Sequence, residues 1–152
     1  MPEIPTSVDV ALHQGIDLFN RGAYYDCHDV LEALWMEADP TDKPFYQGML
    51  QIAVGLYHLA NGNWRGATIL LGEGVNRLRP FEPSYYGVAV ADLVDNGWAW
   101  LMALQQVGEG QVADLAQAAE EARGSSLPIE ITLATTGERL KLPRPIITLI
   151  TP

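Results

Sequence analysis

The residues best suited to chemistry are a histidine and a glutamate one helical turn apart, His28 and Glu32, in the stretch Tyr24–Glu37. If this stretch is a helix, successive side chains are separated by about 100°, and Glu32 falls about 40° from His28. Trp35 and Tyr24 lie within about 40° on the other side of the histidine. The imidazole and the carboxylate therefore lie in an apolar stripe, where polar groups are costly unless they are paired.

A later helix, expected over about 44–59, carries polar residues that could face this pair. The helix is apolar almost all round, as a central buried helix would be. Its polar residues Gln47, Gln51 and His58 nevertheless fall within an arc of about 40°. A narrow polar seam on an apolar helix usually faces another polar group. We therefore predict that this seam faces His28 and Glu32.

Two interpretations of these residues involve no catalysis. The one we favour is a structural network in a binding or scaffold protein: Glu32 accepts a hydrogen bond from His28 or a glutamine, and Gln51 and His58 satisfy one another. The alternative is a small-molecule pocket between helices, with aromatic walls that include Tyr57. Its predicted ligand-binding residues are Tyr24, His28, Glu32, Trp35, Gln47, Gln51 and His58.

A third interpretation is a hydrolytic or metal centre. Glu32 would orient His28 as a general base, so these two are the candidate catalytic residues. As a metal site, His28, His58 and Glu32 would supply two nitrogens and one oxygen, with Asp29 or Glu73 adding another oxygen. The spacing matches neither the paired-histidine metalloprotease motif nor the Glu-x-x-His motif of di-iron bundles. The sequence thus implies no cofactor strongly.

Composition excludes several classes of protein. A chain of 152 residues suits one domain, and its net charge of −10 opposes binding to nucleic acids or anionic membranes. Its apolar runs are too short to cross a bilayer, and residues 1–5 do not resemble an export signal. Cys27 is the single cysteine, so it cannot form an internal disulfide, and we expect a packing role and a cytoplasmic location.

The elements that must position the candidate residues are helices. We predict an all-α bundle of two helical hairpins and one or two further helices, with a short C-terminal β-hairpin or arm. A weak internal similarity at an offset of 41 residues suggests the two hairpins. A tetratricopeptide-type adaptor would need three repeats of fixed period. The helices are expected over about 7–20, 24–38, 44–59, 64–78, 88–107 and 111–123, and the strands over 129–133 and 140–142.

Two features bear on packing and assembly. The third helix has Gly48 and Gly55 beside the polar seam, and the fourth has Gly66, Gly72 and Gly74, so we expect very close helix approach. We divide the chain into a helical domain, 1–124, and an arm, 125–152, packed on it or on a neighbouring subunit. The end of the arm is apolar and needs a surface, which predicts a dimer or a protein partner.

The candidate residues belong to an ordered set of motifs that resembles the family called domain of unknown function 309. The motifs span about residues 14–80, and the family's usual Glu after the histidine is Asp29 here. The resemblance implies a small all-helical protein, supports the importance of His28, Glu32, Gln47 and Gln51, and brings no established activity. The matching residues are Phe19-Asn20, Tyr24-Tyr25-x-x-His28-Asp29-x-x-Glu32-x-x-Trp35, Phe45-Tyr46-Gln47-Gly48-x-x-Gln51-x-Ala53 and Gly62-Asn63-x-x-Gly66-Ala67.

Overall fold

The computed structural model describes residues 6–123, 125 and 128–150, which form six α-helices and one antiparallel β-hairpin. The predicted all-α class with a C-terminal hairpin is confirmed. Two single-turn 3-10 helices, Arg79–Phe81 and Glu109–Gln111, join helices. The elements are α1 (Thr6–Asn20), α2 (Tyr24–Glu37), α3 (Lys43–Ala60), α4 (Trp64–Leu78), α5 (Val90–Val107), α6 (Val112–Glu121), β1 (Ile129–Thr132) and β2 (Arg139–Leu142).

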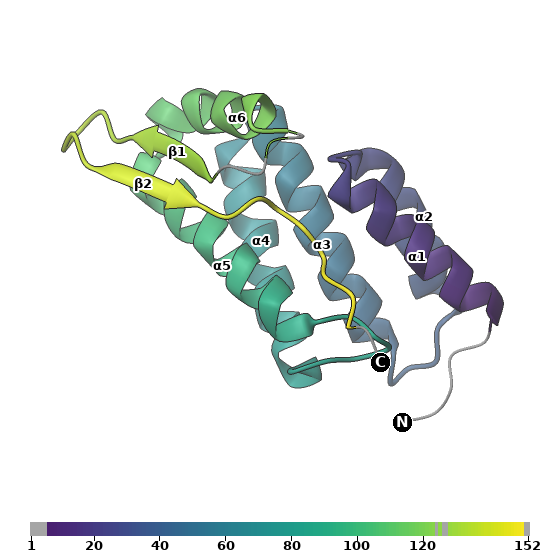
Figure 1. Ribbon diagram of the computed structural model, residues 1–152. Helices are drawn as coiled ribbons and strands as arrows, with labels where there is room; N and C mark the ends of the chain where they lie inside the picture. The colour runs from purple at the N-terminus through teal and green to yellow at the C-terminus, as the bar shows by residue number, and fades with distance from the viewer. Residues whose placement is uncertain (1–5, 124, 126–127, 151–152) are drawn as a thin grey trace.

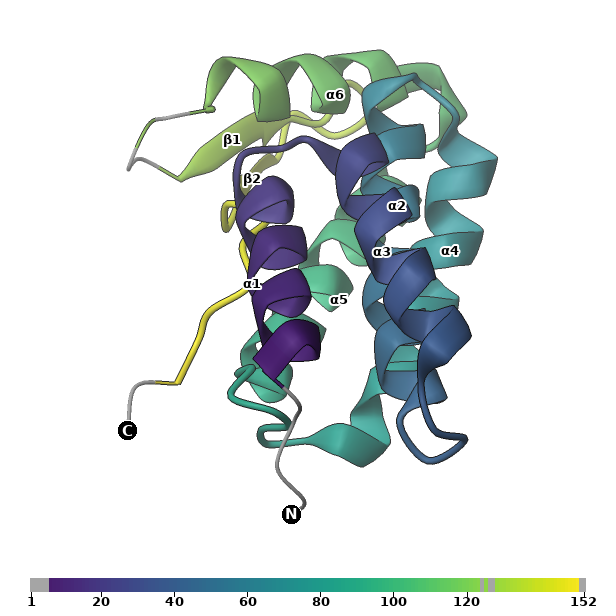
Figure 2. The same cartoon turned by 90° about the vertical axis from the view of Figure 1, so that its right-hand side faces the viewer.

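The bundle is built around α3. The α1–α2 hairpin lies on one side of α3, while α4 and then α5 lie on the other (Figure 1). Helix α6 and the β-hairpin lie across one end of the bundle (Figure 2). Helix α3 buries residues on most of its faces, as its nearly continuous apolar sequence predicts. The helix that carries the polar seam is thus held between two others.

Glycines bring α3 and α4 into close contact. A Cβ atom at Gly74 would lie 2.9 Å from the carbonyl oxygen of Gly48 and 3.0 Å from the backbone nitrogen of Ile52. A Cβ at Gly55 would lie 3.1 Å from the backbone nitrogen of Leu71. Backbone atoms cannot move aside as a side-chain end can, so these glycines are needed for the observed helix spacing.

Two tryptophans of α5 differ in burial. Trp98 is 46% exposed, with its ring 5.8 Å from the guanidinium of Arg79, whereas Trp100 is fully buried and donates its indole N–H to the carbonyl of Pro143. Relative to the buried Leu93, Trp98 lies about 140° round the helix and Trp100 about 20° away. The helical spacing therefore favoured Trp100 from the start.

The C-terminal arm packs on its own chain. Ile129 and Ile131 of the hairpin are buried, and the hairpin contacts α5 and α6. The Asn20 side chain donates to the carbonyl of Ile147 at 3.0 Å and accepts from its N–H at 2.7 Å, and Ala89 N–H donates to the carbonyl of Thr148 at 2.9 Å. Ile147 is buried, but Ile146, Leu149 and Ile150 remain 41%, 38% and 50% exposed, so the apolar end of the arm that led us to expect a dimer is covered only in part.

No helix in the described part of the chain is both long and apolar enough to span a bilayer.

Candidate functional site

The histidine–glutamate pair forms, but at the margin of the bundle. His28 Nε2 lies 3.1 Å from Glu32 Oε2, one turn further along α2. The side chain of Glu32 is 49% exposed and that of His28 is 28% exposed. The prediction that the Glu32 carboxylate looks inward is thus wrong. The reason is that a side chain about 40° from the centre of an apolar stripe can still bend its charged end into water.

Both ring nitrogens of His28 lie beside carboxylates of its own helix. Nε2 faces Glu32, and Nδ1 is buried, 3.3 Å from Asp29 Oδ1 but without a hydrogen bond. A general base needs a nitrogen within hydrogen-bond reach of the proton it removes. In this arrangement neither nitrogen of the imidazole is available to act as a general base.

The buried glutamine of the seam has different partners from those expected. Gln51 Nε2 donates to Glu73 Oε2 at 2.8 Å, and Arg77 Nε donates to Gln51 Oε1 at 3.0 Å. These bonds join α3 to α4, so the predicted pairing of Gln51 with His58 is wrong. Gln47 is half-buried and takes no part in either set of contacts. The seam thus faces α4 as well as α2.

The two imidazoles do come together, at a small cavity between α2 and α3. The Tyr25 ring lies 5.6 Å from that of Tyr57 and 5.7 Å from that of His28, centroid to centroid. Tyr25 was not among the predicted ligand-binding residues, although it lies only about 60° from His28 on the helix. We call this space, of about 100 Å³, the aromatic cavity; it is lined by Tyr24, Tyr25, His28, Val54, Tyr57 and His58.

His58 is held in place at this cavity by the turn that follows α3. Its Nδ1 lies 3.3 Å from Asn63 Nδ2, and a Cβ at Gly66 would approach the imidazole to 2.9 Å. Asn63 also caps α4 by accepting from the Gly66 N–H at 3.0 Å. The Asn63 and Gly66 of the family-like motif therefore position a residue of the cavity.

The surroundings of the aromatic cavity are acidic. A neighbouring depression of about 250 Å³ shares Tyr24, Tyr25 and Tyr57 with it and adds Asp26. Asp29 and Glu32 flank His28. None of the described residues that line the two spaces is a lysine or an arginine. The site therefore combines aromatic walls with nearby carboxylates.

Four of the predicted ligand-binding residues are not part of the cavity lining: Glu32, Trp35, Gln47 and Gln51. Trp35 instead lies under Lys43, whose ammonium is 4.8 Å from the indole centroid and donates to the Trp35 carbonyl at 2.9 Å. This contact ties the end of α2 to the start of α3. Trp35 therefore belongs to the frame of the site.

The residues considered for a metal site do not form one. Among the described residues, no three histidine, cysteine, aspartate or glutamate side chains are placed to hold a metal ion. His28 and His58 line the same cavity, but Glu32 turns to solvent and Glu73 bonds to Gln51. The proposed set of His28, Glu32 and His58 is therefore not a ligand cluster in this fold.

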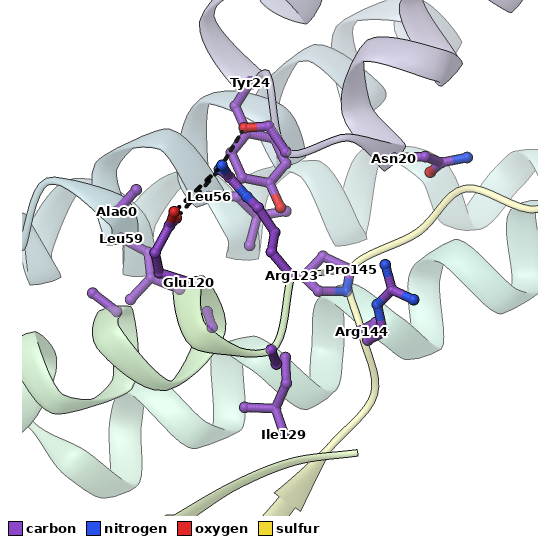
Figure 3. Close-up of a pocket in the computed structure, with 14 residues that line it drawn as sticks. Asn20, Tyr24, Leu56, Leu59, Ala60, Glu120, Arg123, Ile129, Arg144 and Pro145 are labelled. Atoms are coloured by element: carbon purple, nitrogen blue, oxygen red, sulfur yellow. Dashed lines mark hydrogen bonds and ion pairs between the residues drawn. The ribbon is translucent and has the colours of Figure 1, made fainter. Parts of the chain in front are cut away.

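A second cavity, of about 50 Å³, lies where α6 and the C-terminal arm meet the α1–α2 turn and the end of α3 (Figure 3). Tyr24 lines this cavity as well as the aromatic one. We call it the arginine cavity, because Arg123 and Arg144 both line it. Its walls come from segments about 100 residues apart, so no local sequence pattern indicates this cavity.

The fold and the aromatic cavity define a helical-bundle protein with a site between its second and third helices. Residues 12–70, which supply every residue lining the aromatic cavity, match the model of the family described as domain of unknown function 309. The resemblance to this family is therefore confirmed for that segment.

One relative matches part of the chain. The uncharacterized protein YpuF of Bacillus subtilis (strain 168) is 37% identical over 57 residues, which cover 37% of this chain and 33% of that protein. The match thus spans about a third of that relative.

Proposed function

We propose that this protein is a binding protein whose aromatic cavity takes an organic cation, such as a quaternary ammonium group. The observation that supports the proposal is the lining: three tyrosines and two histidines surround a space of about 100 Å³. Aromatic rings attract cations through the negative faces of their π-systems, and tyrosine-rich cages are a recurring way to recognise ammonium groups.

The charge around the cavity favours the same ligand. Asp26, Asp29 and Glu32 lie beside the rings, and the whole chain has a net charge of −10. An approaching cation would be drawn to this surface, and a cationic ligand would meet no like charge in the lining. The volume fits a compact group and is small for a drug-sized molecule.

The predicted structural network is retained in part. The hydrogen bonds from Gln51 to Glu73 and from Arg77 to Gln51 use the amide's donor and acceptor to join α3 to α4. A satisfied buried network of this kind fixes helix pairing. We therefore assign Gln51 to the structural network, and His28 and His58 to ligand binding.

Hydrolysis with His28 as general base has less support. Its Nε2 faces Glu32 and its Nδ1 is buried, so no nitrogen is directed at a bound substrate. A binding role uses the faces of the rings and needs neither nitrogen. The geometry therefore favours binding over catalysis at this site.

The test compares choline with its neutral isostere, 3,3-dimethylbutan-1-ol, by nuclear magnetic resonance titration of the full chain. We expect choline to bind at least about tenfold more tightly, because only choline carries the charge that the rings attract. Tyr57→Leu keeps an apolar wall but removes the ring, and should abolish that preference. Trp98→Leu, a change at an exposed aromatic residue away from the cavity, is the matched control and should keep it.

Equal binding of the two probes would show an apolar site and contradict the proposal. So would unchanged choline binding in Tyr57→Leu.

A further inference from the structure

The arginine cavity lies between the family-like segment and the rest of the chain. Asn20, Tyr24, Leu56 and Leu59 come from the family-like segment, and α6 and the C-terminal arm supply the opposite wall (Figure 3). The cavity volume of about 50 Å³ exceeds the roughly 10–15 Å³ that one water molecule needs. The space therefore suits a group as large as a carboxylate or a phosphate.

Two guanidinium groups line this cavity, and the protein neutralises them unequally. Arg123 donates to the carbonyl of Gly22 at 3.1 Å and lies 3.4 Å from a carboxylate oxygen of Glu120. Arg144 is half-buried, and within the described residues its guanidinium has neither a hydrogen-bond acceptor nor an ion-pair partner. A buried or half-buried guanidinium is stable when an anion accepts its N–H groups.

The hydroxyl of Tyr24 is the third polar group at this cavity. It points into the space (Figure 3), and no described residue forms a hydrogen bond with it. Burial raises the pKa of the Tyr24 hydroxyl to about 12, so it stays a neutral hydrogen-bond donor at physiological pH. Arg123, Arg144 and Tyr24 thus each bring a hydrogen-bond donor to the lining of this cavity.

We propose that the arginine cavity binds a small oxyanion, a carboxylate or phosphate group, held by Arg123, Arg144 and the hydroxyl of Tyr24. Guanidinium groups donate paired N–H bonds that match the oxygens of both kinds of anion. Of these two arginines, only Arg123 has a carboxylate of a described residue beside it, so an added anion would supply the charge that Arg144 lacks. Such an anion would join α2, α6 and the C-terminal arm.

The inference goes beyond the proposed cation binding and does not depend on it. Tyr24 contributes its ring to the aromatic cavity and its hydroxyl to the arginine cavity. Phosphate or acetate can be titrated with no organic cation present. The two proposals can therefore fail separately.

The test is isothermal titration calorimetry of the full chain with inorganic phosphate and, separately, with acetate, at constant ionic strength set by sodium chloride. Arg144→Gln removes the unpaired guanidinium, and we expect it to weaken binding at least about tenfold. Arg139→Gln makes the same charge change on an exposed β2 side chain and should leave binding unchanged. Preference for phosphate or for acetate identifies the kind of oxyanion.

A second variant keeps the proposal testable if Arg144→Gln misfolds. Tyr24→Phe removes one donor and keeps the ring, so affinity should fall severalfold while circular dichroism is unchanged. The proposal is overturned if neither anion gives a saturable signal with the native chain. It is also overturned if Arg144→Gln and Arg139→Gln bind equally well.

Discussion

The amide of Gln51 has the most to lose on mutation among the polar groups of the seam. Its side chain is 9% exposed, and its donor and acceptor are both used, by Glu73 and Arg77. Glu32 is the opposite case, with a half-exposed carboxylate bonded to a neighbour on its own helix. Water competes with the partners of an exposed ion pair and weakens it, whereas little water reaches hydrogen bonds inside a packed interface.

We predict that Gln51→Leu, which keeps the volume and removes the hydrogen bonds, lowers the free energy of unfolding by about 1–2 kcal/mol. Glu32→Gln should change it by less than about 0.5 kcal/mol. Urea denaturation followed by circular dichroism measures both. Equal losses in the two variants would mean that the His28–Glu32 pair is as structural as the Gln51 network.

The thiol of Cys27 should be chemically inert in the folded protein. It is fully buried, and burial raises its pKa to about 12, so almost no thiolate is present at neutral pH. We predict that a disulfide reagent such as Ellman's reagent reacts with the native chain at least about a hundredfold more slowly than with the chain in denaturant. Rapid modification of the native chain, with circular dichroism unchanged, would contradict a packing role.

At the scale of elements, the α3–α4 interface depends on glycines whose surroundings differ. The added Cβ at Gly74 would meet backbone atoms of α3, whereas the nearest atom to an added Cβ at Gly72 is a Leu101 methyl, 3.8 Å away. The expectation of close packing at Gly72 is therefore wrong. Alanine is a better helix former than glycine, so the two positions should respond with opposite signs.

Gly74→Ala should lower the free energy of unfolding by about 2 kcal/mol or more, because the helices must separate. Gly72→Ala is the matched control, because an added Cβ there meets only a Leu101 methyl at ordinary contact distance. It should raise the free energy of unfolding by up to about 1 kcal/mol. Urea denaturation of both variants decides the matter. Destabilisation by Gly72→Ala, or stabilisation by Gly74→Ala, would contradict the observed helix spacing.

The connector between α4 and α5 is tied to the start of α3 through one carboxylate. The hydroxyls of Tyr85 and Tyr86 both donate to Asp42, the latter at 2.7 Å, and the two rings make tilted and edge-to-face contacts with Phe45. Burial and the bond to Asp42 raise the pKa of Tyr85, and the bond to Asp42 is the main cause of the raised pKa of Tyr86. Loss of either phenolic proton would place two negative charges together.

At the scale of the whole molecule, raised pKa values predict alkaline unfolding. The pKa values of Tyr24 and Cys27 are raised by burial to about 12 from ordinary values of 10.0 and 9.0, and burial also raises that of Tyr46. The unfolded chain loses these protons first, so it is increasingly favoured above those ordinary values. Their contribution to stability is full below about pH 9 and is lost as the pH rises through about 12.

Urea denaturation between about pH 7 and about pH 11, followed by circular dichroism and by tyrosinate absorbance, measures this loss. We expect a falling midpoint from about pH 9 upward, with part of the tyrosinate signal appearing only on unfolding. Cys27→Ala should remove the part of the fall that begins near pH 9 and leave the part that begins near pH 10. A midpoint that stays constant to about pH 11 would contradict the burial of these groups.

Local sequence patterns were enough to predict the helices, the hairpin and the stripe around His28. Periodicity and turn residues are local, so each element could be identified without knowing its neighbours. The placement of Cys27 in the core and of Gly48 and Gly55 at a close contact followed from the same patterns.

The pairing of polar groups between helices depends on how the helices pack, which local sequence patterns do not show. The sequence placed Gln51 and His58 on one seam, but the bundle set Gln51 against α4 and His58 against α2, because a helix between two others offers its seam to both. The arginine cavity could not be predicted at all, since Tyr24 and Arg144 lie 120 positions apart and only chain packing joins them.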